Sequence, residues 1–134
     1  MNDASGYARD RGFTLVELLL VLFIVALLAS IVAPSVIGSM QKARESTLKE
    51  DLHVLRKALD DHYADHGKYP DELAELVEKR YVRRIPVDPI TGRSDTWVLA
   101  REDSREDEGE GGGIRDIHSG AEGQARDGQY YKDL

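Results

Sequence analysis

The sequence predicts an α+β fold in which one long N-terminal helix packs on a small antiparallel sheet. Three observations support this prediction. An apolar run occupies most of residues 13–33, leucines then recur every three or four residues over residues 48–59, and two segments with strand character lie later in the chain, at residues 96–100 and 113–118. The helix would therefore come first and the sheet last.

The composition suits one small domain with a polar surface beside a membrane segment. The chain has 134 residues, 32% of them charged and 7% aromatic, and its formal net charge is −7. Such a chain carries no basic stripe that could neutralise phosphates, so we do not expect it to bind nucleic acid. Because it contains no cysteine, disulfides and thiolate metal sites are excluded.

Residues 13–33 form the first predicted element, an apolar helix of membrane length. At about 1.5 Å per residue this helix would reach roughly 31 Å, one hydrocarbon thickness. Its only charged residue is Glu17. A carboxylate costs about 2.5–3.5 kcal/mol at mid-bilayer and less near the interface. We therefore expect Glu17 to be functional and to have a partner, which must come from the chain terminus or from another molecule.

An amphipathic helix is predicted over residues 39–66. Five residues spaced by three or four would share its inner face: Leu48, Leu52, Leu55, Leu59 and Tyr63. Pro34 and Gly38 come just before this helix, and we expect the helical pattern to break or kink near Pro34. Gly67 is a natural C-terminal stop.

The rest of the chain is predicted to form a short helix, an ordered loop and a hairpin. Asp71 or a neighbour would cap a helix over residues 72–79. Residues 85–92 contain two prolines and a glycine and should form an irregular loop. In the first strand Trp97 and Leu99 would face one side, and the acidic, glycine-rich residues 102–112 would connect it to the second.

No catalytic constellation stands out. His62 and His66 share a helix face, but the glutamate of a zinc-protease motif is absent from their spacing. A solvated helix face is the expected role of both histidines, and we expect no enzymatic activity.

The start of the apolar run reads Arg11-Gly12-Phe13-Thr14-Leu15-Val16-Glu17-Leu18. This segment resembles the processing motif of type IV pilins and type II secretion pseudopilins. The resemblance implies that a prepilin peptidase cuts between Gly12 and Phe13 and that Phe13 is then N-methylated. It also implies that Glu17, the fifth residue counted from Phe13, pairs with the positive Phe13 amine of the neighbouring subunit in a filament.

The body carries a Gly67-Lys68-Tyr69-Pro70 turn, an Ile85-Pro86-Val87-Asp88-Pro89 loop and a glycine-rich acidic tail. Together they resemble the major pseudopilins of type II secretion, which implies a pilin-like fold and a structural calcium ion held by the loop after the last strand. The ligands implied here are Ser119, Glu122 and Asp127. The tail departs from the family pattern, because Glu122 stands where aspartate is usual and a later acidic pair is reduced to Asp127. A solvated polar tail is the alternative.

The resemblance implies a non-enzymatic structural subunit that requires no cofactor apart from the possible calcium. Residues 1–12 would be a leader peptide, residues 13–34 the transmembrane and assembly helix, and residues 35–134 a periplasmic domain. The protein would span the inner membrane once and polymerise into the type II secretion pseudopilus, which drives protein export across the outer membrane. Its partners would be the prepilin peptidase, the minor pseudopilins and the inner-membrane secretion platform.

Two alternatives stay open. One is a type IV pilin, major or minor, with a role in adhesion, motility or DNA uptake. The other is a secreted or anchored binding domain whose conventional signal peptide is cleaved near Pro34.

Overall fold

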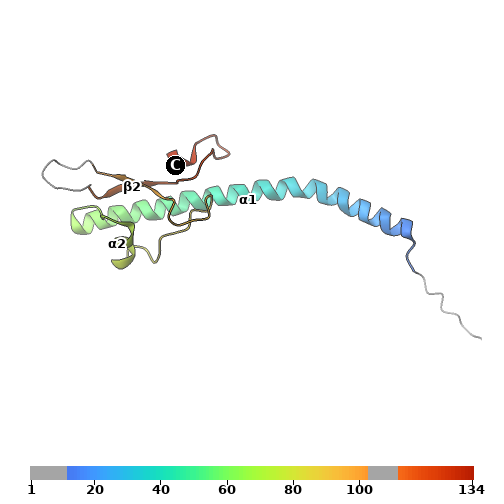
Figure 1. Ribbon diagram of the computed structural model, residues 1–134, viewed down its shortest axis with the longest axis horizontal. Coiled ribbons are helices and arrows are strands. Elements are labelled where there is room, and N and C mark those ends of the chain that lie inside the picture. The colour runs from blue at the N-terminus through green and yellow to red at the C-terminus, as the bar shows by residue number, and fades with distance from the viewer. Residues whose placement is uncertain (1–11, 103–111) are drawn as a thin grey trace, which may run out of the picture. The chain divides into compact units, whose positions relative to one another are not determined.

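The computed structural model describes residues 12–102 and 112–134 (Figure 1). The elements follow in the order α1 (Leu15–His66), α2 (Leu73–Glu78), β1 (Val98–Arg101), β2 (Ile114–His118) and a 3-10 helix, η1 (Tyr131–Asp133). The chain divides into two compact units, Met1–Ser39 and Met40–Leu134. The predicted α+β fold, with a long N-terminal helix and a small antiparallel sheet, is confirmed.

Helix α1 continues through Pro34 without interruption. It ends at His66, and the next residue, Gly67, has φ +70° and donates its N–H to the main-chain oxygen of Tyr63 at 2.8 Å. The predicted break near Pro34 is therefore wrong. A proline removes one backbone donor, but helix formation is cooperative, and the hydrogen bonds on both sides keep this backbone helical.

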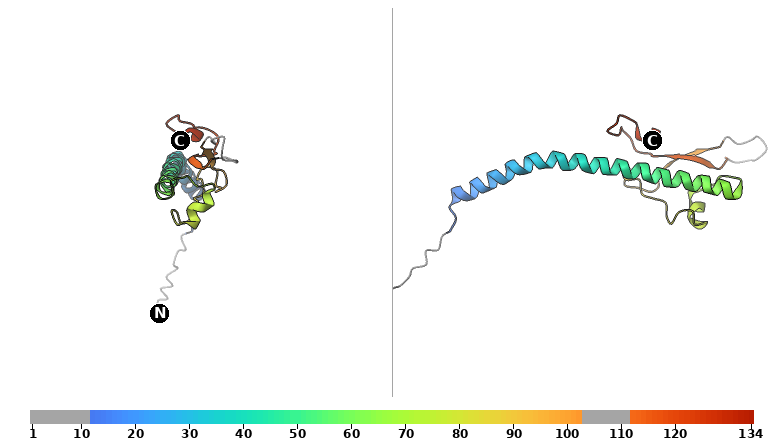
Figure 2. Two further views of the ribbon diagram at one scale, coloured as in Figure 1. Left: turned by 90° about the vertical axis from the view of Figure 1, so that its left-hand side faces the viewer. Right: turned by 180° about the vertical axis from the view of Figure 1, so that it is seen from behind.

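The core of the second unit is built on one face of α1. Leu48, Leu52, Leu55 and Leu59 are all buried there, as predicted. Figures 1 and 2 show α2 and the two strands on different sides of this part of the helix. The other side of the core comes from α2, β1, β2 and the C-terminal segment.

The last turn of α1 differs from the prediction. Tyr63 is 46% exposed and stacks on Tyr69, whereas His62 is completely buried. The Nδ1 of His62 lies 2.8 Å from the main-chain oxygen of Lys68. The expectation of a solvated face is wrong for His62, although His66 is exposed. The cause is geometric, since alternating steps of four and three residues keep a position on one face, while two successive steps of four rotate it away.

Helix α2 lies within the predicted residues 72–79. Leu76 is buried, and Leu73 and Val77 pack partly buried against the core. The cap residue is Glu72, and no side chain caps the helix. The Glu75 carboxylate instead accepts the N–H of Asp71 at 3.0 Å, so the expected capping by Asp71 does not occur.

Strands β1 and β2 pair antiparallel, with Val98 opposite His118 and Leu99 opposite Ile117. Both predicted strands are confirmed, with starts shifted by one or two residues. Trp97 is 8% exposed and Val98 is 53% exposed, which confirms the predicted alternation. Most of the predicted connection, residues 103–111, lies outside the described residues.

Candidate functional site

The first candidate site is the start of α1. Thr14 caps this helix, because its hydroxyl oxygen accepts the backbone N–H of Glu17 at 3.2 Å. Gly12 and Phe13 precede the first helical residue, and Phe13 is 84% exposed. This cap was not predicted from the sequence, although a threonine followed three residues later by glutamate is the known signal of a capping box.

The Glu17 carboxylate makes no hydrogen bond or ion pair with any residue that the structure describes. The capping box is thus only half formed, because the backbone N–H of Glu17 is bound and its side chain is not. Nothing in residues 12–102 or 112–134 satisfies this charge. A partner for the Glu17 carboxylate would have to come from outside the described residues.

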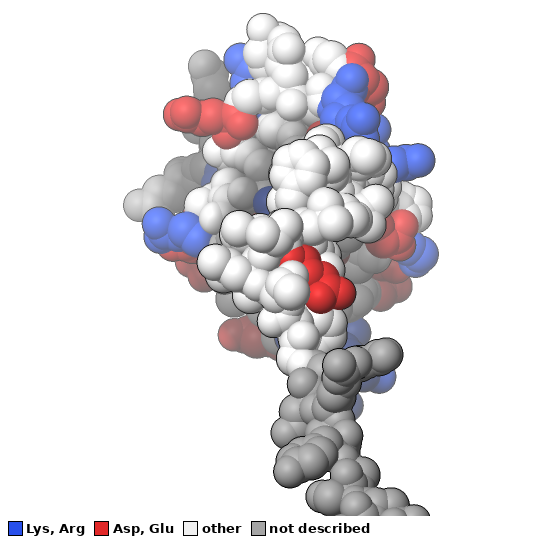
Figure 3. Space-filling model, turned by 90° about the vertical axis from the view of Figure 1, so that its right-hand side faces the viewer, with Lys and Arg blue, Asp and Glu red and all other residues white. Residues whose placement is uncertain are grey.

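The side chains around Glu17 are apolar and exposed. The N-terminal part of α1 is long and apolar enough to cross a membrane, and none of its most apolar stretch is buried. Figure 3 looks onto this end of the helix, where uncharged surface is broken by one acidic group. Glu17 is the only charged residue between Gly12 and Gln41. An exposed apolar surface of this kind needs lipid or another protein to cover it.

The second candidate site is the loop after β2, where calcium was predicted. Ser119 is completely buried and donates its hydroxyl to Asp88 Oδ2 at 2.5 Å. Asp88 is also completely buried and accepts the N–H groups of Ile90 and Thr91, at 2.8 Å and 3.3 Å. This pair closes the proline-containing loop onto the end of β2. The hydroxyl of Ser119 is therefore already in use.

The two other predicted ligands lie on the surface. Glu122 is exposed, and Asp127 accepts a hydrogen bond from Lys49 Nζ at 3.1 Å. The N–H of Gln129 and the Lys49 ammonium hold the pKa of Asp127 below its usual value. No three acidic or histidine side chains gather into a metal-binding group within the part of the chain that the structure describes.

Arg56 joins α1 to β2 and to the end of the chain. Its Nε donates to Asp116 Oδ1 at 2.9 Å, and its Nη2 donates to the main-chain oxygens of Ile117 and Leu134 at 2.9 Å and 2.7 Å. No local sequence pattern indicates these contacts. Partial burial raises the pKa of Asp116, but the Ile117 N–H and the Arg56 guanidinium outweigh burial and hold it below 3.8.

We expect Arg56→Met to lower the free energy of unfolding by about 1–2 kcal/mol near neutral pH, a modest cost because the ion pair is partly solvated. The pKa of Asp116 is lower in the folded state, so the unfolded state binds more protons. Its stabilising effect is thus present above the usual pKa of 3.8 and is lost as the pH falls below that value. Urea unfolding followed by Trp97 fluorescence should show the two proteins converging in acid. An equal difference at neutral and acidic pH would contradict this account.

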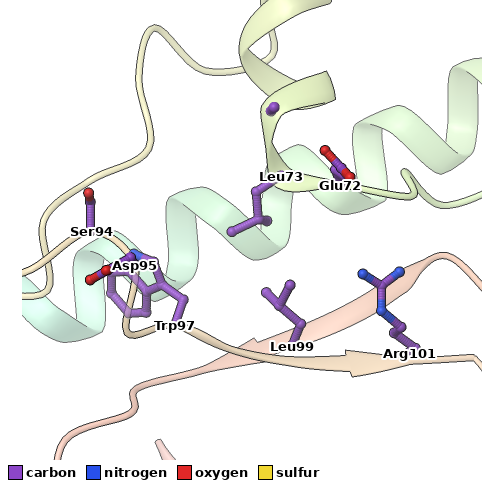
Figure 4. A pocket seen from close by; sticks show the side chains of 8 residues that line it. Glu72, Leu73, Ser94, Asp95, Trp97, Leu99 and Arg101 are labelled. Carbon is purple, nitrogen blue, oxygen red and sulfur yellow. The ribbon is translucent and has the colours of Figure 1, made fainter.

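A shallow cavity of about 370 Å³ lies between the start of α2 and β1. Figure 4 shows Trp97 and Leu99 lining it from one side and Leu73 from the other. Two of the three charged side chains that line it already have hydrogen-bond or ion-pair partners. Arg101 donates to the main-chain oxygen of Asp71 at 2.9 Å, and Asp95 is bound by Arg93 at 2.6 Å. We base no functional site on this cavity.

Comparison with known proteins agrees with the first candidate site. Residues 7–33 match the family model described as the prokaryotic N-terminal methylation motif. The matched segment contains Gly12, Phe13 and Glu17. No solved structure shows a significant match to the chain.

Curated relatives extend the similarity into the body. The type II secretion system core protein G of Pectobacterium carotovorum is 38% identical over 101 residues, which cover 63% of this chain and 64% of the relative. The protein of the same name from Klebsiella pneumoniae is 37% identical over 97 residues, covering 60% of this chain and 69% of the relative. That from Escherichia coli is 34% identical, covering 60% of this chain and 67% of the relative. The chain therefore belongs to the family of type II secretion system core protein G, the major pseudopilins.

Proposed function

We propose that this chain is a structural subunit of a type II secretion pseudopilus. It would polymerise through the N-terminal part of α1 and contribute to protein export across the outer membrane. The observation that carries the proposal is an exposed apolar helix, directly behind Gly12 and Phe13, in which the Glu17 carboxylate has no partner among the residues that the structure describes. The names of the relatives support secretion over the alternative, a type IV pilin.

Processing would remove residues 1–12 as a leader peptide. A prepilin peptidase would cut between Gly12 and Phe13 and leave the Phe13 amine to be methylated. The position of this bond supports the proposal, because Gly12 and Phe13 precede the helix and are exposed. A peptide bond outside a helix is open to a protease without local unfolding.

Assembly would pair Glu17 with the Phe13 amine of the neighbouring subunit. A lone carboxylate in an apolar helix is unfavourable, and a paired one is tolerated. Because the charge recurs once per subunit, the same pairing would also set the register between subunits. Residues 13–34 would cross the inner membrane before assembly, and residues 35–134 would lie in the periplasm.

The subunit would work without enzymatic activity and without a required cofactor. Besides copies of itself and the prepilin peptidase, its partners would be the minor pseudopilins and the inner-membrane secretion platform. The apolar helix supports contact with membrane-embedded partners, and the acidic composition makes nucleic acid an unsuitable one.

Mass spectrometry of the mature protein tests the processing proposal. We expect the mature chain to begin at N-methylated Phe13, since the peptidase and the methylating activity act on this bond and this amine. A mature chain that begins near Pro34 would instead indicate a conventional signal peptide, and the pseudopilin function would fail with it.

A further inference from the structure

Three side chains of α1 line up beside the C-terminal segment. Gln41, Glu45 and Lys49 are spaced four residues apart and therefore follow one another along one side of the helix. Each forms a hydrogen bond with a residue between Arg126 and Tyr131. Figures 1 and 2 show this C-terminal segment, in red, beside the part of α1 that carries the three residues. We call Gln41, Glu45 and Lys49 the clasp.

Glu45 is the centre of the clasp. Its side chain is buried, with 9% of the residue exposed. Its Oε1 accepts three hydrogen bonds, from the Tyr131 hydroxyl at 3.2 Å, the Arg126 backbone N–H at 3.2 Å and Gln41 Nε2 at 3.1 Å. A buried carboxylate is tolerated only when donors surround it. Two of these three donors come from the C-terminal segment, so the segment must stay in place for Glu45 to stay satisfied.

Tyr131 fixes the geometry from the other side. It is 4% exposed, and its hydroxyl accepts Gln41 Nε2 at 2.7 Å while it donates to Glu45. Burial, with the charge of Glu45, raises the pKa of Tyr131. The phenol therefore remains a protonated donor at neutral pH. The ring belongs to the hydrophobic core, which anchors the clasp to the rest of the second unit.

Lys49 places a positive charge beside the carboxylate of Asp127 in the C-terminal segment. Its Nζ lies 3.1 Å from Asp127 Oδ2. A calcium ion at Asp127 would have to share this carboxylate with the ammonium group, and the two cations would repel one another. Calcium also needs six to eight oxygen ligands. The Ser119 hydroxyl is bound to buried Asp88, which leaves Glu122 as the uncommitted side chain of the three implied by the resemblance.

We infer that the clasp holds the C-terminal segment of this chain without a metal ion. The Lys49 ammonium neutralises Asp127 in the way that a calcium ion would. The residues present do not fit calcium. This inference concerns the stability of the second unit and does not depend on processing or filament assembly, so either proposal can fail without the other.

Thermal unfolding of the full chain in detergent micelles tests the metal question. Trp97 is the only tryptophan and is 8% exposed, so its fluorescence reports unfolding of the second unit. We expect the midpoint in EGTA and the midpoint in about 10 mM calcium, well above the dissociation constants of weak extracellular sites, to agree within about 2 °C. A calcium site present at ten times its dissociation constant would raise the midpoint by more than this. Such a rise would overturn the inference.

Variants in EGTA test the clasp itself. Glu45→Ala removes the acceptor oxygen that Tyr131, Gln41 and the Arg126 N–H share, and we expect the midpoint of thermal unfolding to fall by roughly 10 °C. Glu45→Gln keeps an acceptor oxygen, so it should lower the midpoint by less than Glu45→Ala does. Lys49→Glu should also lower the midpoint, and adding Asp127→Lys to it should restore most of the loss, because the pair is then reversed.

Lys57→Glu is the matched control for Lys49→Glu. Lys57 is an exposed lysine of the same helix whose ion pair, with Asp61 at 2.6 Å, stays within α1. If Lys49→Glu changes the midpoint no more than Lys57→Glu does, or if Asp127→Lys restores nothing, the clasp is refuted. The Lys49 variants lie at the surface, so they keep the test decisive if Glu45→Ala does not fold.

Discussion

A Glu17→Ala variant is expected to enter the membrane as well as the wild type and to form no filaments. Removing the carboxylate relieves a cost of about 2.5–3.5 kcal/mol at mid-bilayer, less near the interface, so insertion is not impaired. Assembly would lose the proposed partner of the Phe13 amine, and each subunit would bury one uncompensated positive charge in the filament core, at a cost of about 3–5 kcal/mol. Membrane fractionation and electron microscopy of sheared filaments would measure the two steps separately.

Two further variants separate the charge of Glu17 from its place in the helix cap. Thr14→Val removes the hydroxyl that accepts the Glu17 N–H and keeps the carboxylate, so it should still assemble. Glu17→Gln keeps the size and polarity of the side chain and removes the charge, so it should fail like Glu17→Ala. Normal filaments from Glu17→Ala would refute the pairing. If Thr14→Val forms no filaments while Glu17→Gln does, the helix cap rather than the charge is what assembly needs.

Gly120→Ala is expected to destabilise the second unit more than an alanine at any other glycine that the structure describes. A Cβ built at Gly120 would overlap the main-chain oxygen of Thr96. A backbone oxygen cannot rotate away as a side chain can, so either the segment before β1 or the loop after β2 must move. Buried Ser119 and its bond to Asp88 lie next to Gly120. Overpacking of this kind should lower the free energy of unfolding by about 3 kcal/mol.

Gly92→Ala is the matched control for Gly120→Ala. Gly92 has φ +72° and open space around its Cβ position, so an alanine there costs only the left-handed conformation, about 1 kcal/mol. Urea unfolding of both variants, followed by Trp97 fluorescence, would compare the two causes. If both variants lower the free energy of unfolding equally, the overlap with Thr96 is relieved at little cost.

Local patterns carried much of the prediction. The apolar helix, the leucine face of α1, the helix stop at Gly67 and the two strands were all visible in the sequence, because hydrophobic period and turn residues act over a few neighbours. The predicted break at Pro34 was wrong because this prediction, too, considered only a few neighbouring residues. A local helix-breaking preference was weighed without the cooperative hydrogen bonding of the 52-residue helix around it.

Local sequence patterns were enough to predict the main helices and both strands, and they indicated Gly12, Phe13 and Glu17 as the residues of the proposed processing and assembly. The partners of the polar side chains in the second unit, in contrast, depend on the tertiary fold. Glu45 meets Tyr131 across 86 residues and Ser119 meets Asp88 across 31. Hydrophobic period tells which face of a helix turns inward, but it carries no information about which distant polar group will lie opposite. That depends on how the chain folds back, and here it placed a lysine beside Asp127, a proposed calcium ligand.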